Sequence, residues 1–517
     1  MPAHTKALST DALVAVIGAG AMGAGIAQVA AQAGHPVKLY DNREGASAEA
    51  IDKIGAQLEK LVARGKFTAE QREGVLSRMT PVDNIDALAD AKLVVEAIVE
   101  NLNVKRSVLE SLEALCSDDC ILASNTSSLS ITSLAAGRKN PSRIVGMHFF
   151  NPAPIMKLVE VVSGLATDPA VAETVYETSL AWGKKPVYTR STPGFIVNRV
   201  ARPFYAESLR LLQEQAADCA TLDALMRDAG GFRMGAFELT DLIGHDVNYA
   251  VTCSVFDAYY GDFRFQPSLI QKELVDAGRL GRKTGHGFYD YSEGAERPQA
   301  AALSSESPLK QCSIVGSSGP LMSLQERFVA SGVTLNKVAA EADLAGLDGM
   351  FRTADATIAL TDGRMACQRA VEDGIENLVL IDLALDYNKA SRLAISWAHN
   401  TSDAAVQQVV DLLAAAGITA TPLADVPGLA LMRTVAMLAN EGADAVLHDV
   451  GDVAGVDLAM CAGVNYPRGP LAWADQVGVA RIEAVLANLQ ATYGEDRYRP
   501  SLLLRRLSAQ GKSFYES

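Results

Sequence analysis

The sequence predicts an α/β protein: a Rossmann-type, doubly wound parallel sheet followed by an all-α domain, with a degenerate second copy of the pair. Short apolar runs typical of buried strands alternate with helical patterns over the first 192 residues. From Pro193 to about Leu280 the pattern is mainly helical. An ungapped repeat then relates residues 193–244 to residues 427–478, at a constant shift of 234 positions. The helical domain is therefore predicted to be duplicated.

Length, composition and charge limit the possible functions. A chain of 517 residues with 49% hydrophobic residues is expected to form several domains with large cores. The net charge of −15 argues against a nucleic-acid partner and against binding to a membrane surface. Seven scattered cysteines without a CxxC motif predict neither a disulfide framework nor a zinc site, so no metal is expected. No signal peptide precedes Leu13 and no apolar run reaches about 18 residues, which predicts a cytoplasmic protein.

The predicted elements follow in order along the chain. Strands are predicted at residues 13–17, 37–41, 92–97, 120–124 and 143–148, and a long helical stretch over about 48–79. Residues 292–310 are rich in Ala, Ser, Glu and Pro without an apolar period, which predicts a linker. The predicted segments are a Rossmann domain (1–192), a helical domain (193–291), the linker (292–310), a degenerate Rossmann-like region (311–426) and a second helical domain (427–517).

The turn after the first predicted strand carries three glycines, in the sequence Val-Ile-Gly18-Ala-Gly20-Ala-Met-Gly23. Gly18 allows a tight turn, Gly20 lets a pyrophosphate approach the backbone, and Gly23 lets the helix pack closely on the strand. Asp41 ends the next strand, where its carboxylate can bind both ribose hydroxyls and repel a 2′-phosphate. The pattern predicts a site for NAD rather than NADP. An ordinary helix N-cap is the alternative interpretation of Asp41.

A histidine and a glutamate lie six residues on either side of Pro154, in two apolar stretches joined by a proline-rich loop. His148 and Glu160 can therefore face each other across an antiparallel pair of strands. Oxidation of an alcohol requires removal of the hydroxyl proton as hydride leaves the carbon, and a histidine has a suitable pKa. We predict His148 as the base and Glu160 as its orienting carboxylate. A satisfied core histidine is the alternative.

Three further polar residues are candidates for substrate contact. Ser127 follows a predicted strand at the carboxyl edge of the sheet, where its hydroxyl can bond a substrate oxygen; a helix N-cap is the alternative. Asn198 begins the helical domain and faces the cleft if Pro193-Gly194 forms a hinge; a helix-surface position is the alternative. Asn151 either bonds a substrate carbonyl or braces the proline loop.

The predicted helix after Asp41 has a basic face. Lys53, Gln57, Lys60 and Arg64 follow one another at spacings that place them along one side of the helix. A basic ridge suits an anionic ligand, and it matters more in a chain of net charge −15. A solvated amphipathic helix is the alternative.

The order and spacing of these segments resemble the L-3-hydroxyacyl-CoA dehydrogenase family, well over residues 11 to about 291 and more faintly beyond. The resemblance implies NAD as cofactor and an acyl-CoA as substrate. It implies that His148 is the catalytic base, that Glu160 is its partner and that Asn198 lies on the substrate side. It also implies that the helix carrying Lys53, Lys60 and Arg64 covers the CoA moiety.

The resemblance also extends the predicted cofactor site. Glu100 and Lys105 match positions that contact cofactor in the family, although a solvated helix start explains them almost as well from the residues alone. Met22 in the glycine-rich turn and Asn125 after a predicted strand complete the predicted set of cofactor-binding residues.

The region 311–426 is similar to the first Rossmann domain, but chemically important positions differ. Ser318 and Leu321 stand where the first copy has Gly20 and Gly23. Both positions must be bare for pyrophosphate approach and helix packing, so no second NAD site is predicted. A rougher alignment places Ala384 near the Ser127 position and Trp397 near the His148 position. Chance similarity between generic α/β patterns is the alternative.

The most specific function that the sequence predicts is NAD-dependent oxidation of (S)-3-hydroxyacyl-CoA to 3-oxoacyl-CoA. The length and the duplicated domain resemble long bacterial forms of the family from phenylacetate degradation, which act on 3-hydroxyadipyl-CoA. Arg199, Arg202 and Arg233 are unranked candidates for binding the distal carboxylate. A 3-hydroxybutyryl-CoA dehydrogenase and a non-catalytic NAD-binding structural protein are the alternatives. The two helical domains are predicted to pack together within one chain as a pseudo-dimer, and a homo-oligomer remains open.

Overall fold

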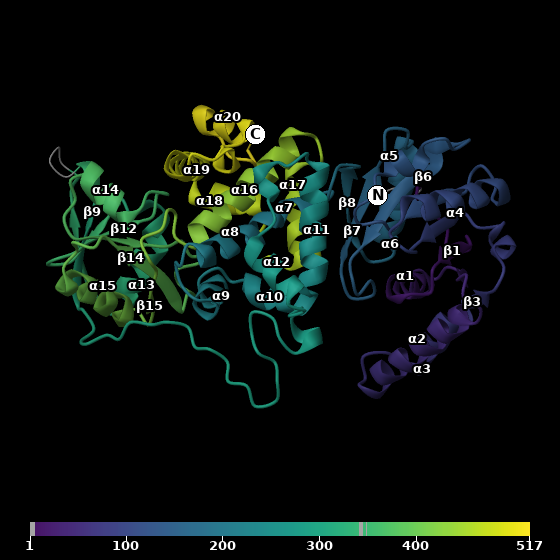
Figure 1. The fold of residues 1–517 in the computed structure, drawn as a ribbon, viewed down its shortest axis with the longest axis horizontal. Coiled ribbons are helices and arrows are strands. Elements are labelled where there is room, and N and C mark those ends of the chain that lie inside the picture. Colours follow the sequence, from purple (N-terminus) through teal and green to yellow (C-terminus); the bar gives the residue numbers. More distant parts are fainter. Residues whose placement is uncertain (1–5, 341–344, 348, 517) are drawn as a thin grey trace. The chain divides into compact units, whose positions relative to one another are not determined.

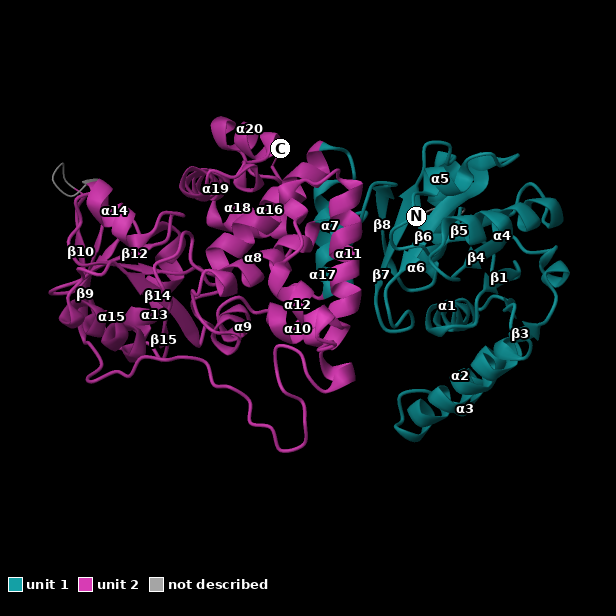
Figure 2. Cartoon of the chain, in the orientation of Figure 1, with its two compact units in different colours: residues 1–199, 448–464 teal, residues 200–447, 465–517 magenta. Residues whose placement is uncertain are grey.

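A computed structural model describes residues 6–340, 345–347 and 349–516 (Figure 1). The chain forms two compact units, one of residues 1–199 with 448–464 and one of residues 200–447 with 465–517 (Figure 2). These units cut across the predicted segments, because a helix from the second helical domain belongs to the first unit. Each unit is described in turn.

The first unit contains an eight-stranded sheet in the order β3-β2-β1-β4-β5-β6-β7-β8. Its strands are β1 (Val14–Ile17), β2 (Val37–Tyr40), β3 (Met79–Val82), β4 (Leu93–Glu96), β5 (Ile121–Ser124), β6 (Ile144–Phe149), β7 (Leu158–Ser163) and β8 (Lys185–Arg190). Neighbours are parallel except β6 and β7, which pair antiparallel. The strand order changes direction between β1 and β4, as in the predicted doubly wound sheet, so a ligand site is expected at their carboxyl ends.

Helices cover both faces of this sheet. They are α1 (Ala21–Gln32), α2 (Ala46–Ala63), α3 (Ala69–Ser77), η1 (Ile85–Leu88), α4 (Leu102–Leu115), α5 (Ile131–Ala135), η2 (Pro141–Arg143) and α6 (Pro169–Ala181). Val14 and Val16 of β1 belong to one hydrophobic core and Ala15 and Ile17 to a second. Because successive strand residues point to opposite faces, β1 is buried on both sides, which explains its continuous apolar run.

The predicted helical stretch over 48–79 consists of two helices. The chain forms α2 and α3 with a turn between them, in which Gly65 has a φ of +67°. A left-handed glycine ends a helix at low conformational cost. Thr68 then starts α3 with a capping box, in which its side chain accepts from the backbone N–H of Gln71.

The helical domains follow the predicted repeat closely. The first contains α7 (Val197–Val200), α8 (Arg202–Gln213), α9 (Cys219–Asp228), α10 (Ala236–Ile243), α11 (His245–Ala258), η3 (Phe263–Phe265), α12 (Leu269–Asp276) and η4 (Arg282–Thr284). The second contains α16 (Leu431–Leu447), α17 (Val453–Val464), α18 (Pro470–Val477), α19 (Val479–Tyr493), η7 (Asp496–Tyr498) and α20 (Leu502–Gln510). At the shift of 234 positions, α9 aligns with α17 from its first residue, and α10 aligns with α18. The repeat is therefore present in the structure as well as in the sequence.

Helices α8 and α16 pack against each other within the second unit, as predicted for a pseudo-dimer within one chain. Arg433 of α16 is fully buried and bonds the carboxylates of Glu207 (2.7 Å) and Glu214 (2.8 Å). Tyr498 donates to the same Glu207 at 3.0 Å. A buried arginine with two carboxylate partners and hydroxyl groups around it ties the two copies together.

The two copies also exchange helices. Helix α9 of the first helical domain packs on β14 of the second sheet, whereas α17 of the second helical domain packs on β7 and β8 of the first sheet. The two helices occupy equivalent positions of the repeat. Figure 2 accordingly colours α17 with the first unit. Each Rossmann-type sheet is therefore covered by a helix of the other copy's helical domain.

The second unit contains a seven-stranded sheet in the order β10-β9-β11-β12-β13-β14-β15. Its elements are β9 (Gln311–Val315), η5 (Gly319–Leu321), α13 (Met322–Ala330), β10 (Thr334–Val338), η6 (Ala345–Leu347), β11 (Phe351–Arg352), β12 (Thr357–Leu360), α14 (Ala366–Glu372), β13 (Leu378–Ile381), β14 (Arg392–Trp397), α15 (Asp403–Ala415) and β15 (Thr419–Pro422). A short strand, β11, runs antiparallel between β9 and β12. Strands β13 and β14 pair antiparallel, as β6 and β7 do in the first sheet.

The predicted linker, 292–310, contains no helix or strand but is bonded to the second unit. The backbone N–H of Leu303 donates to Ala420 O at 2.9 Å. The Asp411 carboxylate accepts from Ser305 Oγ and from the N–H groups of Glu306 and Ser307. The segment therefore has a defined path along the second sheet. Among the described helices, none combines the length and apolar character needed to cross a bilayer.

Candidate active site

The antiparallel pair β6–β7 brings His148 and Glu160 directly opposite each other, as predicted. His148 Nδ1 lies 2.7 Å from Glu160 Oε2, and Glu160 is fully buried. Because a carboxylate only accepts hydrogen bonds, Nδ1 carries the proton and Nε2 is left with a free lone pair. This is the tautomer that a general base requires.

Glu160 has a second role that the sequence did not reveal. Its other oxygen, Oε1, accepts from the backbone N–H groups of Ile196 (2.9 Å) and Val197 (3.0 Å) at the start of α7. The carboxylate thus fixes the imidazole and holds the first turn of the helix that carries Asn198. Asn198 is half-buried, and within the described residues its side chain makes no hydrogen bond.

Aromatic rings enclose the imidazole. The Phe150 ring centroid lies 4.5 Å from that of His148, and the Phe195 ring centroid lies 5.8 Å away. His148 is only 5% exposed. These rings exclude water around the base and limit the rotation of the imidazole, so the free Nε2 has a defined position.

The glycine-rich turn has the geometry that a dinucleotide site requires. Gly18 has a φ of +102°, and a Cβ at Gly23 would lie 1.8 Å from Gly18 O. A Cβ at Gly20 would meet no atom within 4 Å, so space for a ligand lies beside the backbone there. No side chain caps the first turn of α1, which leaves its N–H groups available to a pyrophosphate. The turn therefore fits NAD.

Asp41 lies beside this turn. Its Oδ2 accepts from the backbone N–H of Ala19 at 2.7 Å, and its Oδ1 accepts from the backbone N–H of Arg43 at 2.9 Å. The carboxylate is therefore fixed against the turn, with one further lone pair on each oxygen for ribose hydroxyls. Asp41 precedes α2 by several residues and α2 begins after Gly45, so Asp41 is not its N-cap.

One cavity of about 820 Å³ joins the predicted cofactor and substrate groups. Its wall includes the glycine-rich turn at Gly20, Asp41, the proline loop at Asn151 and the exposed face of α2. The predicted basic residues on this face are Lys53, Lys60 and Arg64. Arg64 is the C-cap residue of α2.

The basic residues of α2 are available to a ligand. Within the described part of the chain, no carboxylate lies within ion-pair distance of Lys53, Lys60 or Arg64. Glu59, on another side of α2, pairs with Arg72 of α3 at 3.1 Å. Unpaired cations on the wall of a cavity attract an anionic group such as the phosphates of CoA.

Glu100 and Lys105 form a cluster below the Ser127 loop. The Lys105 amine is almost fully buried, 2.7 Å from Glu96 Oε2 and 3.4 Å from Glu100 Oε2. Glu100 Oε1 accepts from Thr126 Oγ1 (2.6 Å) and from the backbone N–H of Ser127 (3.0 Å). Burial raises the pKa of Glu100, but the hydrogen bond from Thr126 and the charge of Lys105 outweigh it, so this pKa lies below its usual value. A solvated helix start is therefore wrong for Lys105.

This cluster positions Ser127. Glu100 fixes the Ser127 backbone, while within the described residues the Ser127 hydroxyl makes no hydrogen bond. Asn125 Oδ1 accepts from the backbone N–H of Phe149 at 2.8 Å, which connects the end of β5 to the residue after His148. Met22 is half-buried in the first turn of α1. Direct cofactor contact by Met22, Glu100, Lys105 and Asn125 stays a prediction.

The second sheet corrects the alignment that placed Trp397 at the His148 position. Trp397 pairs with Val379, and Ile395 pairs with Ile381. At the shift of 234 positions this register is the same as that of β6 and β7, so Asp382 stands at the His148 position and Ala394 at the Glu160 position. The looser alignment failed because the glycine-rich turns align at a shift of 298 positions and the paired strands at 234, so only the pairing register fixes the equivalence.

Asp382 shows what the second copy retains. Its carboxylate accepts from the backbone N–H groups of Ala430 (2.9 Å), Leu431 (2.7 Å) and Met432 (2.9 Å). Ala430 and Leu431 are equivalent to the residues that Glu160 holds in the first copy. Burial raises the pKa of Asp382 to about 6. The second copy has therefore kept the anchoring of its helix and lost the imidazole.

The three arginines considered for a distal carboxylate differ in their surroundings. Arg199 is buried, with its guanidinium 3.3 Å from the His448 ring. Arg233 is exposed. Arg202 is buried in the second unit and lines a cavity there.

Comparison with protein families covers most of the chain. The family described as "3-hydroxyacyl-CoA dehydrogenase, NAD binding domain" matches residues 13–192. "3-hydroxyacyl-CoA dehydrogenase, C-terminal domain" matches both 194–291 and 428–515. "3-hydroxybutyryl-CoA dehydrogenase reduced Rossmann-fold domain" matches residues 358–427.

Individual relatives agree with this result. The 3-hydroxyadipyl-CoA dehydrogenase of Escherichia coli K12 is 47% identical over 98% of both chains. A 3-hydroxybutyryl-CoA dehydrogenase of Clostridioides difficile is 41% identical over 54% of this chain and 99% of its own. A crystal structure described as 3-hydroxybutyryl-CoA dehydrogenase from Escherichia coli K12 has a TM-score of 0.87 and 46% identity, covering 98% of this chain and 99% of that one. The chain belongs to the 3-hydroxyacyl-CoA dehydrogenase family and is an NAD-dependent oxidoreductase.

Proposed function

We propose that this enzyme oxidises (S)-3-hydroxyadipyl-CoA to 3-oxoadipyl-CoA with NAD⁺. The His148–Glu160 pair supports the reaction class, because it supplies a correctly oriented base. The similarity to the 3-hydroxyadipyl-CoA dehydrogenase of Escherichia coli, along nearly the whole length of both chains, supports the substrate.

In the proposed mechanism, the cavity beside Gly20 and Asp41 holds the dinucleotide and the basic face of α2 holds the CoA phosphates. When bound, NAD⁺ accepts the hydride. His148 Nε2 takes the hydroxyl proton, and Glu160 stabilises the imidazolium that results. We assign Ser127 and Asn198 to hold the substrate oxygens, because both side chains lack partners among the described residues. Asn151, on the cavity wall, is assigned to the substrate side of the site.

A 3-hydroxybutyryl-CoA dehydrogenase is the second candidate function. It is favoured by the names of several relatives, including the structure from Escherichia coli. Comparing kcat/KM for 3-hydroxyadipyl-CoA and 3-hydroxybutyryl-CoA, by following NADH absorbance, tests the choice. A higher value for 3-hydroxybutyryl-CoA would reverse the proposed order.

We expect the enzyme to prefer NAD to NADP, and the Asp41→Ala variant to narrow that preference. The Asp41 carboxylate is fixed against the turn, where a 2′-phosphate would meet its negative charge. The measurement is kcat/KM for both cofactors in the unmutated enzyme and the variant. Equal use of both cofactors by the unmutated enzyme would contradict this assignment.

We also expect one NADH site per chain. Ser318 and Leu321 occupy two of the glycine positions in the second copy, and Asp382 occupies the position of the base. Titration of the full-length enzyme with NADH, followed by fluorescence or calorimetry, should give a stoichiometry near one. A Gly20→Val variant should then lose this binding, whereas two equivalent sites would show that the second sheet also binds the cofactor.

A further inference from the structure

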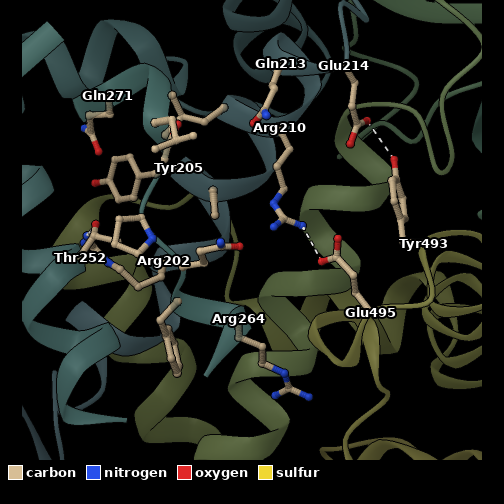
Figure 3. Close-up of a pocket in the computed structure, with 17 residues that line it drawn as sticks. Arg202, Tyr205, Arg210, Gln213, Glu214, Thr252, Arg264, Gln271, Tyr493 and Glu495 are labelled. Atoms are coloured by element: carbon tan, nitrogen blue, oxygen red, sulfur yellow. Dashed lines mark hydrogen bonds and ion pairs between the residues drawn. The ribbon is translucent and has the colours of Figure 1, made fainter. Parts of the chain in front are cut away.

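A second cavity lies wholly within the second unit and has a volume of about 450 Å³. Residues of α8, α11, α12 and the segment after α19 line it. Figure 3 shows two sides of different character. Arg202, Tyr205, Thr252 and Gln271 gather on one side. The other side carries the pairs Arg210–Glu495 and Tyr493–Glu214.

Three arginines line this cavity, and two of them have acidic partners. Arg264 bonds Asp444 and, at 3.3 Å, Glu441. Arg210 lies 3.7 Å from Glu495. The third arginine, Arg202, differs from both.

Arg202 is a buried cation without an anionic partner. It is 5% exposed, and its guanidinium donates to Thr252 Oγ1 at 3.0 Å. Its Nε is buried and has no hydrogen-bond partner, and no described carboxylate lies within ion-pair distance. The hydroxyl of Ser268, also on the cavity wall, is a second buried group without a partner.

A buried guanidinium without a counter-charge, on the wall of a cavity, is suited to bind a planar anion. Burying a charge without a counter-charge costs several kcal/mol, and a ligand anion removes that cost. The planar donors of arginine match the two oxygens of a carboxylate. The centroid of the Tyr205 ring lies 4.9 Å from the guanidinium carbon, so the two groups make a cation–π contact.

The repeat shows that the helical fold does not need this cation. At the shift of 234 positions, Ala436 and Ala439 stand in α16 where Arg202 and Tyr205 stand in α8. Both alanines are fully buried in α16, so this helix packs without a charged residue at either position. The arginine and its aromatic neighbour are therefore a feature of the first copy, which also carries the catalytic pair.

We propose that this cavity binds a carboxylate group, held by Arg202, with its partner Thr252 and the Ser268 hydroxyl on the wall of the same cavity. The carboxylate comes either from the distal end of a dicarboxylyl-CoA substrate or from a free dicarboxylate. The first source rests on the proposed function. The second source is independent of the proposed function.

The test uses full-length Arg202→Gln, with Arg279→Gln as the matched control at an exposed arginine of the same helical domain. Titration calorimetry with adipate should show affinity falling about 10- to 100-fold in Arg202→Gln and unchanged in the control, the scale of a charge-assisted hydrogen-bond pair. In parallel, kcat/KM is measured with 3-hydroxyadipyl-CoA and 3-hydroxybutyryl-CoA. A loss confined to 3-hydroxyadipyl-CoA identifies the substrate tail as the source, and a loss of adipate binding alone identifies a free dicarboxylate.

The proposal is overturned if Arg202→Gln changes neither the adipate affinity nor the substrate ratio, which is kcat/KM for 3-hydroxyadipyl-CoA divided by kcat/KM for 3-hydroxybutyryl-CoA. If the unmutated enzyme prefers 3-hydroxybutyryl-CoA but Arg202→Gln still loses adipate binding, the proposed substrate fails and the carboxylate site stands. Should Arg202→Gln fold poorly by thermal denaturation, Thr252→Val removes the hydrogen-bond partner of the guanidinium. It should weaken adipate binding about fivefold. Unchanged adipate affinity together with an unchanged substrate ratio in Thr252→Val counts against the site.

Discussion

Replacing His148 by glutamine should lower kcat by about 10²- to 10⁴-fold while NADH binding stays normal, because the change removes a positioned general base and leaves the cofactor cavity intact. The imidazole is held by Glu160 at 2.7 Å and enclosed by the rings of Phe150 and Phe195. Glutamine fits this space but cannot accept the hydroxyl proton. Steady-state rates with acetoacetyl-CoA and NADH, together with a fluorescence titration of NADH, measure both parts.

Two further variants belong to this test, a control at an exposed histidine and a substitution of Glu160. His399→Gln makes the same change at an exposed position of the second unit and should leave kcat unaltered. Glu160→Gln should also inactivate the enzyme, because an amide NH₂ facing Nδ1 would move the imidazole proton to Nε2. The amide oxygen introduced by Glu160→Gln can still accept from the two backbone N–H groups of α7, so this variant should lower turnover far more than the melting temperature. Near-normal turnover in His148→Gln would place the base elsewhere.

Much of this site could be predicted from the sequence, because its parts are local. The three glycines, Asp41 and the spacing of His148 and Glu160 around a proline loop each imply a geometry within one turn or one strand pair. The structure has those geometries. Roles that depend on long-range contacts were not predictable. The bond from Glu160 to α7 and the position of Asp382 follow from strand register and from the docking of a distant helix.

In the fold too, features that depend on local sequence could be predicted, whereas features that depend on distant contacts could not. The doubly wound sheet and the duplicated helical domain follow from local pattern and from the constant shift of the repeat. The exchange of α9 and α17 does not, because both helices have the same place in the repeat and the sequence does not say which sheet each will cover. The break between α2 and α3 depended on the left-handed conformation of one glycine, Gly65.

The exchange of helices gives the second half, which lacks the proposed catalytic residues, a structural link to the proposed active site. Helix α17 packs on β7, the strand that carries Glu160. At Gly463 the backbone comes so close to this strand that a Cβ would lie 2.5 Å from Leu158 Cδ2 and 3.2 Å from Val197 Cγ2. Leu158 precedes Glu160 on the strand, and Val197 is one of the two residues that Glu160 holds. The second half thus packs on two residues that adjoin Glu160, the proposed partner of the base.

Truncation after Tyr291 should therefore abolish turnover, by about 10²-fold or more, while the fragment keeps its Rossmann fold. The fragment loses α17 from β7 and exposes the face of α8 that packs on α16. A shift of about 1 Å in a catalytic group can cost 10²-fold. The uncovered apolar face should make the fragment dimerise or aggregate.

A point substitution in the full-length chain tests whether the packing of α17 on β7 is needed for turnover, because this chain does not expose the apolar face of the fragment. Gly463→Leu pushes α17 away from β7 and should lower kcat with both α8 and α16 in place, whereas Ala454→Leu, at an exposed position of the same helix, should not. NADH titration and circular dichroism show whether the cofactor cavity and the fold survive, and light scattering reports the state of the fragment. A monomeric, fully active fragment ending at Tyr291 would mean that β7 holds Glu160 in place unaided. Since Gly463 leaves no room for a Cβ between α17 and β7, we expect instead that the two halves act as one catalytic unit.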